Sequence, residues 1–63
     1  MYDVDREIVE TMVRYGGSFV RHLGEACRFA DSVNIERIKK AFPEYWEQYA
    51  MMAGVIKAQE GKL

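Results

Sequence analysis

Apolar side chains in the N-terminal half of the chain recur every three or four residues. When successive residues are placed about 100° apart, one set falls within a band about 80° wide. The set comprises Ile8, Met12, Tyr15, Phe19, Leu23, Ala26 and Ala30. Asp3 can cap the first turn, and Asp5 and Glu7 suit the positive end of the helix dipole. The pattern therefore predicts one helix over residues 4–30.

Two adjacent glycines, Gly16 and Gly17, interrupt this predicted helix. Each costs about 1 kcal/mol relative to alanine in a helix interior. The alternative is a pair of helices hinged at these glycines. Because the apolar phase continues unchanged across them, and a break seldom preserves phase, we favour the continuous helix.

Capping residues and a proline divide the rest of the chain into two further helices. Asp31 or Ser32, followed by Glu36, indicates the start of a helix that ends near residue 42. Pro43 disfavours helical geometry at the residue before it and suits the first turn of a new helix. The third predicted helix runs from residue 44 to about 58. Its apolar stripe comprises Tyr45, Tyr49, Met52 and Ile56.

The predicted fold class is all-α, with a long N-terminal helix packed against a short and a medium helix as a helical hairpin or three-helix bundle. Residues 1–63 form a single domain, without internal repeats. The residues expected to be most buried are Phe19, Leu23, Ile38, Phe42, Tyr45, Trp46, Tyr49 and Met52. A chain this short buries only about 60% of its unfolded surface, so we expect self-association, most simply as a dimer.

Composition narrows the classes of function. The 9 Lys and Arg nearly balance the 10 Asp and Glu, so the chain is neither a polybasic arm nor an acidic tail. One cysteine and one histidine cannot supply the ligands of a zinc site, and we expect no metal and no cofactor. No apolar run approaches the roughly 18 to 20 residues of a membrane span, and no signal-peptide pattern is visible. We therefore expect a cytoplasmic protein that makes no membrane contact.

His22 and Cys27 are the side chains with the most reactive chemistry. The helical neighbours of His22 include Ser18 and Glu25, but these do not form a nucleophile and base arrangement. Cys27 is expected to be a buried, inert thiol, because reactive cysteines need a positive and exposed setting. We therefore predict no catalytic residue and no enzymatic activity.

A row of arginines, seven residues apart and opposite the main apolar stripe, is the candidate basic patch. Glu10 and Glu25 lie within helical reach of these arginines, so ion pairs on a solvated face explain the pattern. Weak nucleic-acid binding by an accessory or regulatory factor is the alternative function. Its candidate residues are Arg14, Arg21, Arg28, Lys39 and Lys40.

A second apolar row lies about 100° from the main stripe of the predicted first helix. Its valines are bordered by glycines, which let another helix backbone approach closely. Two apolar residues of the last helix likewise lie opposite its main stripe. The predicted partner-binding residues are Val9, Val13, Gly17, Val20, Gly24, Met51 and Val55. The other interpretation is that the protein uses this wide face for its own core.

Three short motifs resemble those of a group of short phage and prophage proteins. They are GGSFV at residues 16–20, AD at residues 30–31 and FPEYW at residues 42–46. The resemblance covers residues 16–49 and implies an accessory protein of a mobile element, acting inside a bacterial cell. Small phage proteins of this size often bind and block host machinery, anti-CRISPR proteins among them. The resemblance transfers no functional residue to this chain.

Together these patterns predict a non-enzymatic accessory protein that works by protein–protein contact. That contact is self-association, binding and inhibition of a host protein such as a component of the CRISPR machinery, or both.

Overall fold

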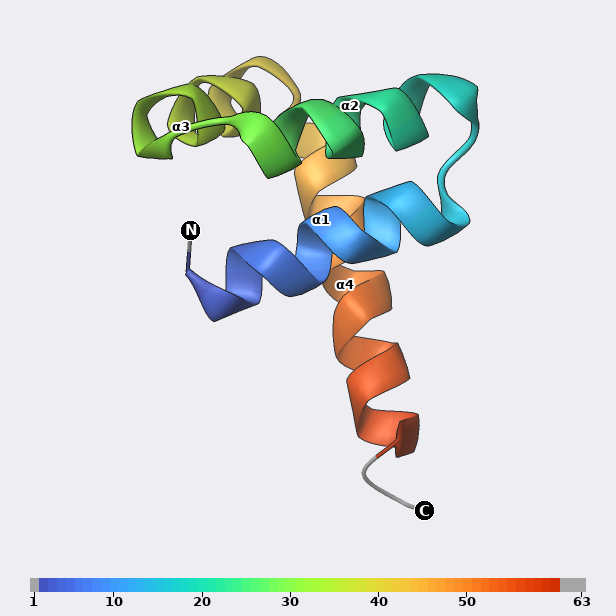
Figure 1. The fold of residues 1–63 in the computed structure, drawn as a ribbon. Helices are drawn as coiled ribbons and strands as arrows, with labels where there is room; N and C mark the ends of the chain where they lie inside the picture. Colours follow the sequence, from blue (N-terminus) through green and yellow to red (C-terminus); the bar gives the residue numbers. More distant parts are fainter. Residues whose placement is uncertain (1, 61–63) are drawn as a thin grey trace.

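The computed structural model describes residues 2–60 and contains four helices in that range. They are α1 (Asp3–Tyr15), α2 (Ser18–Phe29), α3 (Ser32–Ala41) and α4 (Pro43–Glu60). α2 runs antiparallel to α1, whereas α4 crosses α1 steeply and projects beyond the other helices at its C-terminal end (Figure 1). Because no strand occurs in this part of the chain, the predicted all-α class is confirmed.

The prediction of one continuous helix over residues 4–30 is wrong, and the hinged alternative describes the structure. α1 ends at Tyr15, and Gly16 is extended, with φ −72° and ψ 154°. The chain then turns back at Gly17, so that α2 lies along α1 (Figure 1). The bundle consequently has four helices where three were expected. Phase continues across the hinge because both helices turn their apolar sides toward one core.

Glycines allow α1 and α2 to approach closely at two points. A Cβ atom at Gly24 would lie 2.9 Å from Val13 Cγ2 and 3.0 Å from Met12 Cβ. A Cβ atom at Gly16 would meet the Met12 carbonyl oxygen and lie 2.7 Å from Val20 Cγ1. The hinge therefore needs a glycine at residue 16 because a larger side chain has no room there. The backbone angles of Gly16 are not the reason, since any residue can adopt them.

We expect Gly16→Ala to lower the free energy of unfolding by about 1 to 2 kcal/mol. The added methyl group overpacks the hinge, which costs about 1 to 3 kcal/mol, and a stiffer unfolded chain offsets part of this loss. Gly17→Ala is the control, because a Cβ atom there meets nothing within 4 Å. It should be neutral or stabilise the protein by about 0.4 to 1 kcal/mol. Urea denaturation measures both variants, and equal midpoints would contradict the close contact at Gly16.

The second half of the chain follows its predicted boundaries. The Asp31 carboxylate accepts a hydrogen bond from the Asn34 backbone N–H at 2.9 Å and so caps α3. Phe42 leaves helical geometry, with φ −130° and ψ 58°, and Pro43 opens α4 directly after it. The Phe42 carbonyl still accepts from the Trp46 N–H at 3.1 Å, which joins the two helices. α4 continues to Glu60, slightly beyond the predicted end.

The core has two parts that meet at Trp46. One part comprises Ile8, Met12, Val20 and Tyr49, and the other comprises Val9, Cys27 and Ile35. Trp46 packs against both clusters from α4. α1 therefore contacts every other helix through side chains on two of its faces.

The predicted core list is only partly correct. Tyr49 is buried, at 6% exposed, but Phe19 is 56% and Tyr45 37% exposed. The half-buried members of the list are Leu23, Ile38, Phe42, Trp46 and Met52. When the chain folds back at the hinge, Val9 and Val20 of the second apolar row join Ile8 and Met12 of the main stripe in the core. The aromatic residues in the middle of the main stripe, Tyr15 and Phe19, are left exposed at the edge of the bundle.

Candidate protein-interaction surfaces

The row of valines and glycines predicted as an outer face lies inside the molecule. Val9 is 1% and Val20 7% exposed, Gly24 is buried and Val13 is half-buried. The expectation that this row is open to a partner is wrong, because the row packs α1 against α2. Its glycine neighbour Gly17 is exposed at the hinge.

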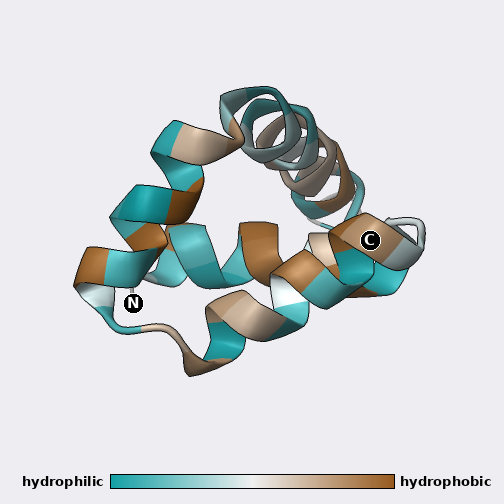
Figure 2. Cartoon of the chain, turned by 90° about the horizontal axis from the view of Figure 1, so that it is seen from above, coloured by the Kyte–Doolittle hydropathy of each residue, from teal (hydrophilic) through white to brown (hydrophobic). Residues whose placement is uncertain are grey.

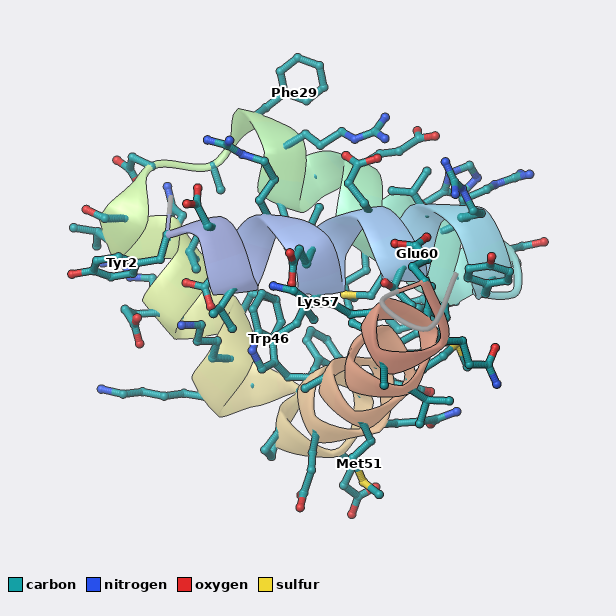
Figure 3. The ribbon with its side chains drawn as sticks, turned by 90° about the horizontal axis from the view of Figure 1, so that it is seen from below. Tyr2, Phe29, Trp46, Met51, Lys57 and Glu60 are labelled. Carbon is teal, nitrogen blue, oxygen red and sulfur yellow. The ribbon has the colours of Figure 1, made fainter. Side chains whose placement is uncertain are left out.

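An apolar groove lies between α2 and α3. Seen from above, these two helices meet at the turn of residues 30–31 and diverge from there (Figure 2). The space between them measures about 470 Å³. The groove is lined by Ala26, Phe29, Ala30, Asn34, Arg37, Ile38 and Ala41. Phe29, at its edge, is 91% exposed and points away from the bundle (Figure 3).

Three aromatic rings cluster where this groove ends. Phe42, which directly follows the groove residue Ala41, lies edge-on to Phe19 with ring centroids 5.7 Å apart. Tyr45 lies 5.8 Å from Phe19 and 6.2 Å from Phe42. Such ring pairs are favourable in themselves, but here much of the Phe19 and Tyr45 surface stays open to solvent. The cluster extends the apolar surface of the groove toward the start of α4.

The groove lining contains one charged side chain, Arg37 of α3. On α2, outside this lining, His22 Nδ1 and Glu25 Oε2 lie 4.0 Å apart, and both side chains are exposed. On α3, Arg37 lines the groove and, within residues 2–60, forms no ion pair. The α3 side therefore presents a positive charge that no carboxylate of the described chain balances.

The predicted basic face is divided among different roles. Arg28 donates two hydrogen bonds to the Glu10 carboxylate, at 2.9 and 2.6 Å, and thereby links α2 to α1. This contact holds the pKa of Glu10 below its usual value of 4.5 and raises the pKa of Arg28. Of the other predicted cations, Arg14, Arg21 and Lys40 are exposed. With Arg28 neutralised, the arginine row loses part of the positive charge that nucleic-acid binding requires.

Lys39, the fifth predicted cation, belongs to an ion pair that joins three helices. Its ammonium group donates to Asp5 of α1 at 3.0 Å and to Glu36 of α3 at 3.2 Å. The same group lies 5.3 Å from the centroid of the Trp46 ring of α4. Asp5 is only 7% exposed, so Lys39 serves the fold and not an outer basic face.

The outer face of α4 keeps the other predicted binding residues exposed. Met51 is 69% and Val55 57% exposed. Met51 points away from the bundle (Figure 3). Gly54 lies between them with no atom near its missing Cβ, and Ala58 is exposed one turn further on. These four residues, which we call the α4 outer face, form the second apolar surface of the molecule.

Cys27 lies in the core of the bundle. Cys27 is fully buried, as predicted, and burial raises the pKa of its thiol. In the part of the chain that the structure describes, no three His, Cys, Asp or Glu side chains are grouped to hold a metal ion. None of the helices found between residues 2 and 60 is long and apolar enough to cross a membrane.

No known family model, curated protein or solved structure matches this chain. The two apolar surfaces, the α2–α3 groove and the α4 outer face, are the features of the structure that bear on function. The α2–α3 groove was not predicted from the sequence, whereas the α4 outer face includes two predicted residues, Met51 and Val55.

Proposed function

We propose that this protein is a non-enzymatic accessory protein that binds another protein through its α2–α3 groove. The observation that carries the proposal is Phe29, 91% exposed beside a groove lined mainly by alanine and isoleucine. A contiguous apolar surface of this kind on a small protein marks an interaction site. Aromatic residues such as phenylalanine are enriched at protein–protein interfaces relative to the rest of the surface.

The partner that fits the groove is an amphipathic helix with an acidic residue beside its apolar face. Two diverging helices accept a third helix between them, with apolar residues spaced at i, i+3, i+4 and i+7 as anchors. Phe29 and the ring cluster around Phe19 offer aromatic contacts at the two ends. Arg37 supplies the positive charge that a carboxylate of the partner balances.

The biological setting of the proposal is a bacterial cell carrying a phage or prophage. Support comes from the order of the motifs GGSFV, AD and FPEYW, all three of which contribute side chains to the groove or to the ring cluster beside it. In this setting the bound protein is a host protein, for example a component of a CRISPR defence system, and binding inhibits it.

The test compares wild-type protein with Phe29→Glu and Val33→Glu as tagged baits in a bacterial lysate. Phe29→Glu should lose the bound host protein, because a carboxylate cannot enter the apolar site and repels an acidic helix. Val33 is 58% exposed and is absent from the groove lining, so Val33→Glu should retain the bound protein. Circular dichroism should show all three baits equally folded, since neither residue is buried.

Arg37→Glu provides a second, electrostatic measurement on the captured protein. Reversing this charge should weaken binding at least tenfold and make the remaining affinity less sensitive to salt. Equal capture by wild-type protein, Phe29→Glu and Arg37→Glu would exclude the groove as the binding surface.

A further inference from the structure

α4 carries apolar residues on two opposite sides. Its inner side, with Tyr49 and Ile56, contacts the rest of the bundle. The residues of the α4 outer face stand at positions 51, 54, 55 and 58, which correspond to i, i+3, i+4 and i+7. This spacing places them along one side of the helix. Residues 48–56 contain no charged side chain. A helix that is apolar on both sides is typical of an element covered from both sides.

The exposed area of the molecule is large for its mass. A folded monomer of 7.3 kDa is expected to expose about 4,200 Å². This chain exposes 4688 Å², an excess of about 500 Å². Figure 1 shows the C-terminal half of α4 projecting beyond the other helices. Two copies that each bury about 500 Å² on this part of α4 would cover about 1,000 Å² in total, the lower limit of a specific interface.

The α4 outer face is complementary to a second copy of itself. In an antiparallel pair centred between residues 54 and 55, Met51 lies opposite Ala58 of the partner subunit. Gly54 then lies opposite Val55 of the partner subunit. Each large side chain thus meets a small one, as close packing of two helices requires. Since none of these positions is charged, the symmetry brings no like charges together on this strip.

From this complementarity we infer that two copies of the protein pair through antiparallel contact of their α4 outer faces. The pair is a symmetric dimer with its axis between Gly54 and Val55. It shares no residue with the groove lining and does not rest on the proposed function.

The first experiment measures mass against concentration by sedimentation, from about 10 µM to 1 mM, the range in which a small interface associates. Wild-type mass should rise from monomer toward dimer. Val55→Glu should raise the dissociation constant at least tenfold, because two carboxylates then meet near the axis. Val33→Glu is the matched control, since Val33 is 58% and Val55 57% exposed, and it should associate like wild type.

A wild-type mass that stays monomeric up to the highest concentration would overturn the inference. Equal association of Val55→Glu and wild type would overturn it as well, by assigning the dimer to another face. Phe29→Glu separates the two proposals, because it should lose the captured protein and keep the wild-type association.

Cysteine crosslinking tests the antiparallel arrangement. Met51→Cys and Ala58→Cys are prepared separately, with Cys27 buried and shielded in both. A mixture of the two variants should form more disulfide-linked dimer under mild oxidation than either variant alone. Faster crosslinking of Met51→Cys with itself would show a parallel pair and would overturn the proposed geometry.

Discussion

Met12→Ala is expected to unfold most of the protein at room temperature. Met12 is 0% exposed and lies in the cluster that joins α1, α2 and α4. Truncation of a buried methionine to alanine costs about 2 to 5 kcal/mol. The core of a chain this short rarely contributes more than about 3 to 5 kcal/mol. Circular dichroism should therefore show a large loss of helical signal and, where a transition persists, a much lower melting temperature.

Phe19→Ala is the informative comparison for this result. The sequence placed Phe19 in the core, which predicts a loss of about 3 to 5 kcal/mol on truncation. In the structure Phe19 is 56% exposed, so its truncation should cost clearly less than that of Met12. If Phe19→Ala unfolds the protein and Met12→Ala leaves the melting temperature unchanged, the aromatic side chains form the core and the hinged arrangement is incorrect.

Local signals in the sequence were sufficient for the second half of the fold. Asp31 caps α3 through a hydrogen bond to a residue three positions along the chain, and Pro43 acts on the residue directly before it. Such effects depend on neighbours in the sequence and hold in any tertiary arrangement. The boundaries of α3 and α4 were for this reason predictable to within about two residues.

The hinge between α1 and α2 depends on contacts that the sequence pattern does not contain. Gly16 and Gly17 are compatible with both a weak helix interior and a turn. The choice is made by the packing of Val9 and Val20 between the two helices, which a single long helix would leave in water. An unbroken apolar phase could not distinguish the two arrangements, because each helix turns an apolar face to the same core.

The α2–α3 groove was missed because its lining comes from two helices whose relative position was unknown. One signal was nevertheless present in the sequence. Phe29 lies about 80° from the centre of the main stripe, on the side away from the second apolar row. This phenylalanine belonged neither to the main stripe nor to the second apolar row, so the predicted bundle gave it no buried position. A large apolar residue without an assigned core position is thus a useful indicator of a binding surface.

Lys39→Met is expected to lower the free energy of unfolding by about 2 to 3 kcal/mol. Removing one partner of a buried ion pair costs about 3 to 5 kcal/mol, and we reduce this figure because the Lys39 side chain is 23% exposed. Methionine is similar to lysine in length but leaves the Asp5 carboxylate without its ammonium donor and the Trp46 ring without its cation. Denaturation in urea measures the loss.

A double-mutant cycle separates this charge effect from packing. Asp5→Asn in the Lys39→Met background removes the uncompensated carboxylate, so the double variant should be more stable than Lys39→Met alone. If Asp5→Asn and Lys39→Met lower the free energy of unfolding additively, the two side chains are not coupled and the ion pair does not hold α1 to α3.

The stability of the protein at alkaline pH provides an independent test of the same ion pair. Burial lowers the pKa of Lys39, but its hydrogen bonds to Asp5 and Glu36 outweigh burial and hold the pKa above its usual value of 10.5. A cation whose pKa is raised by folding contributes stability that is complete below the unfolded value and is lost as pH rises through the folded one. From neutral pH up to 10.5 the stability difference between wild type and Lys39→Met should therefore be constant, and above pH 10.5 it should shrink. A difference that stays constant through the alkaline range would show that Lys39 stabilises the fold through its aliphatic stem alone.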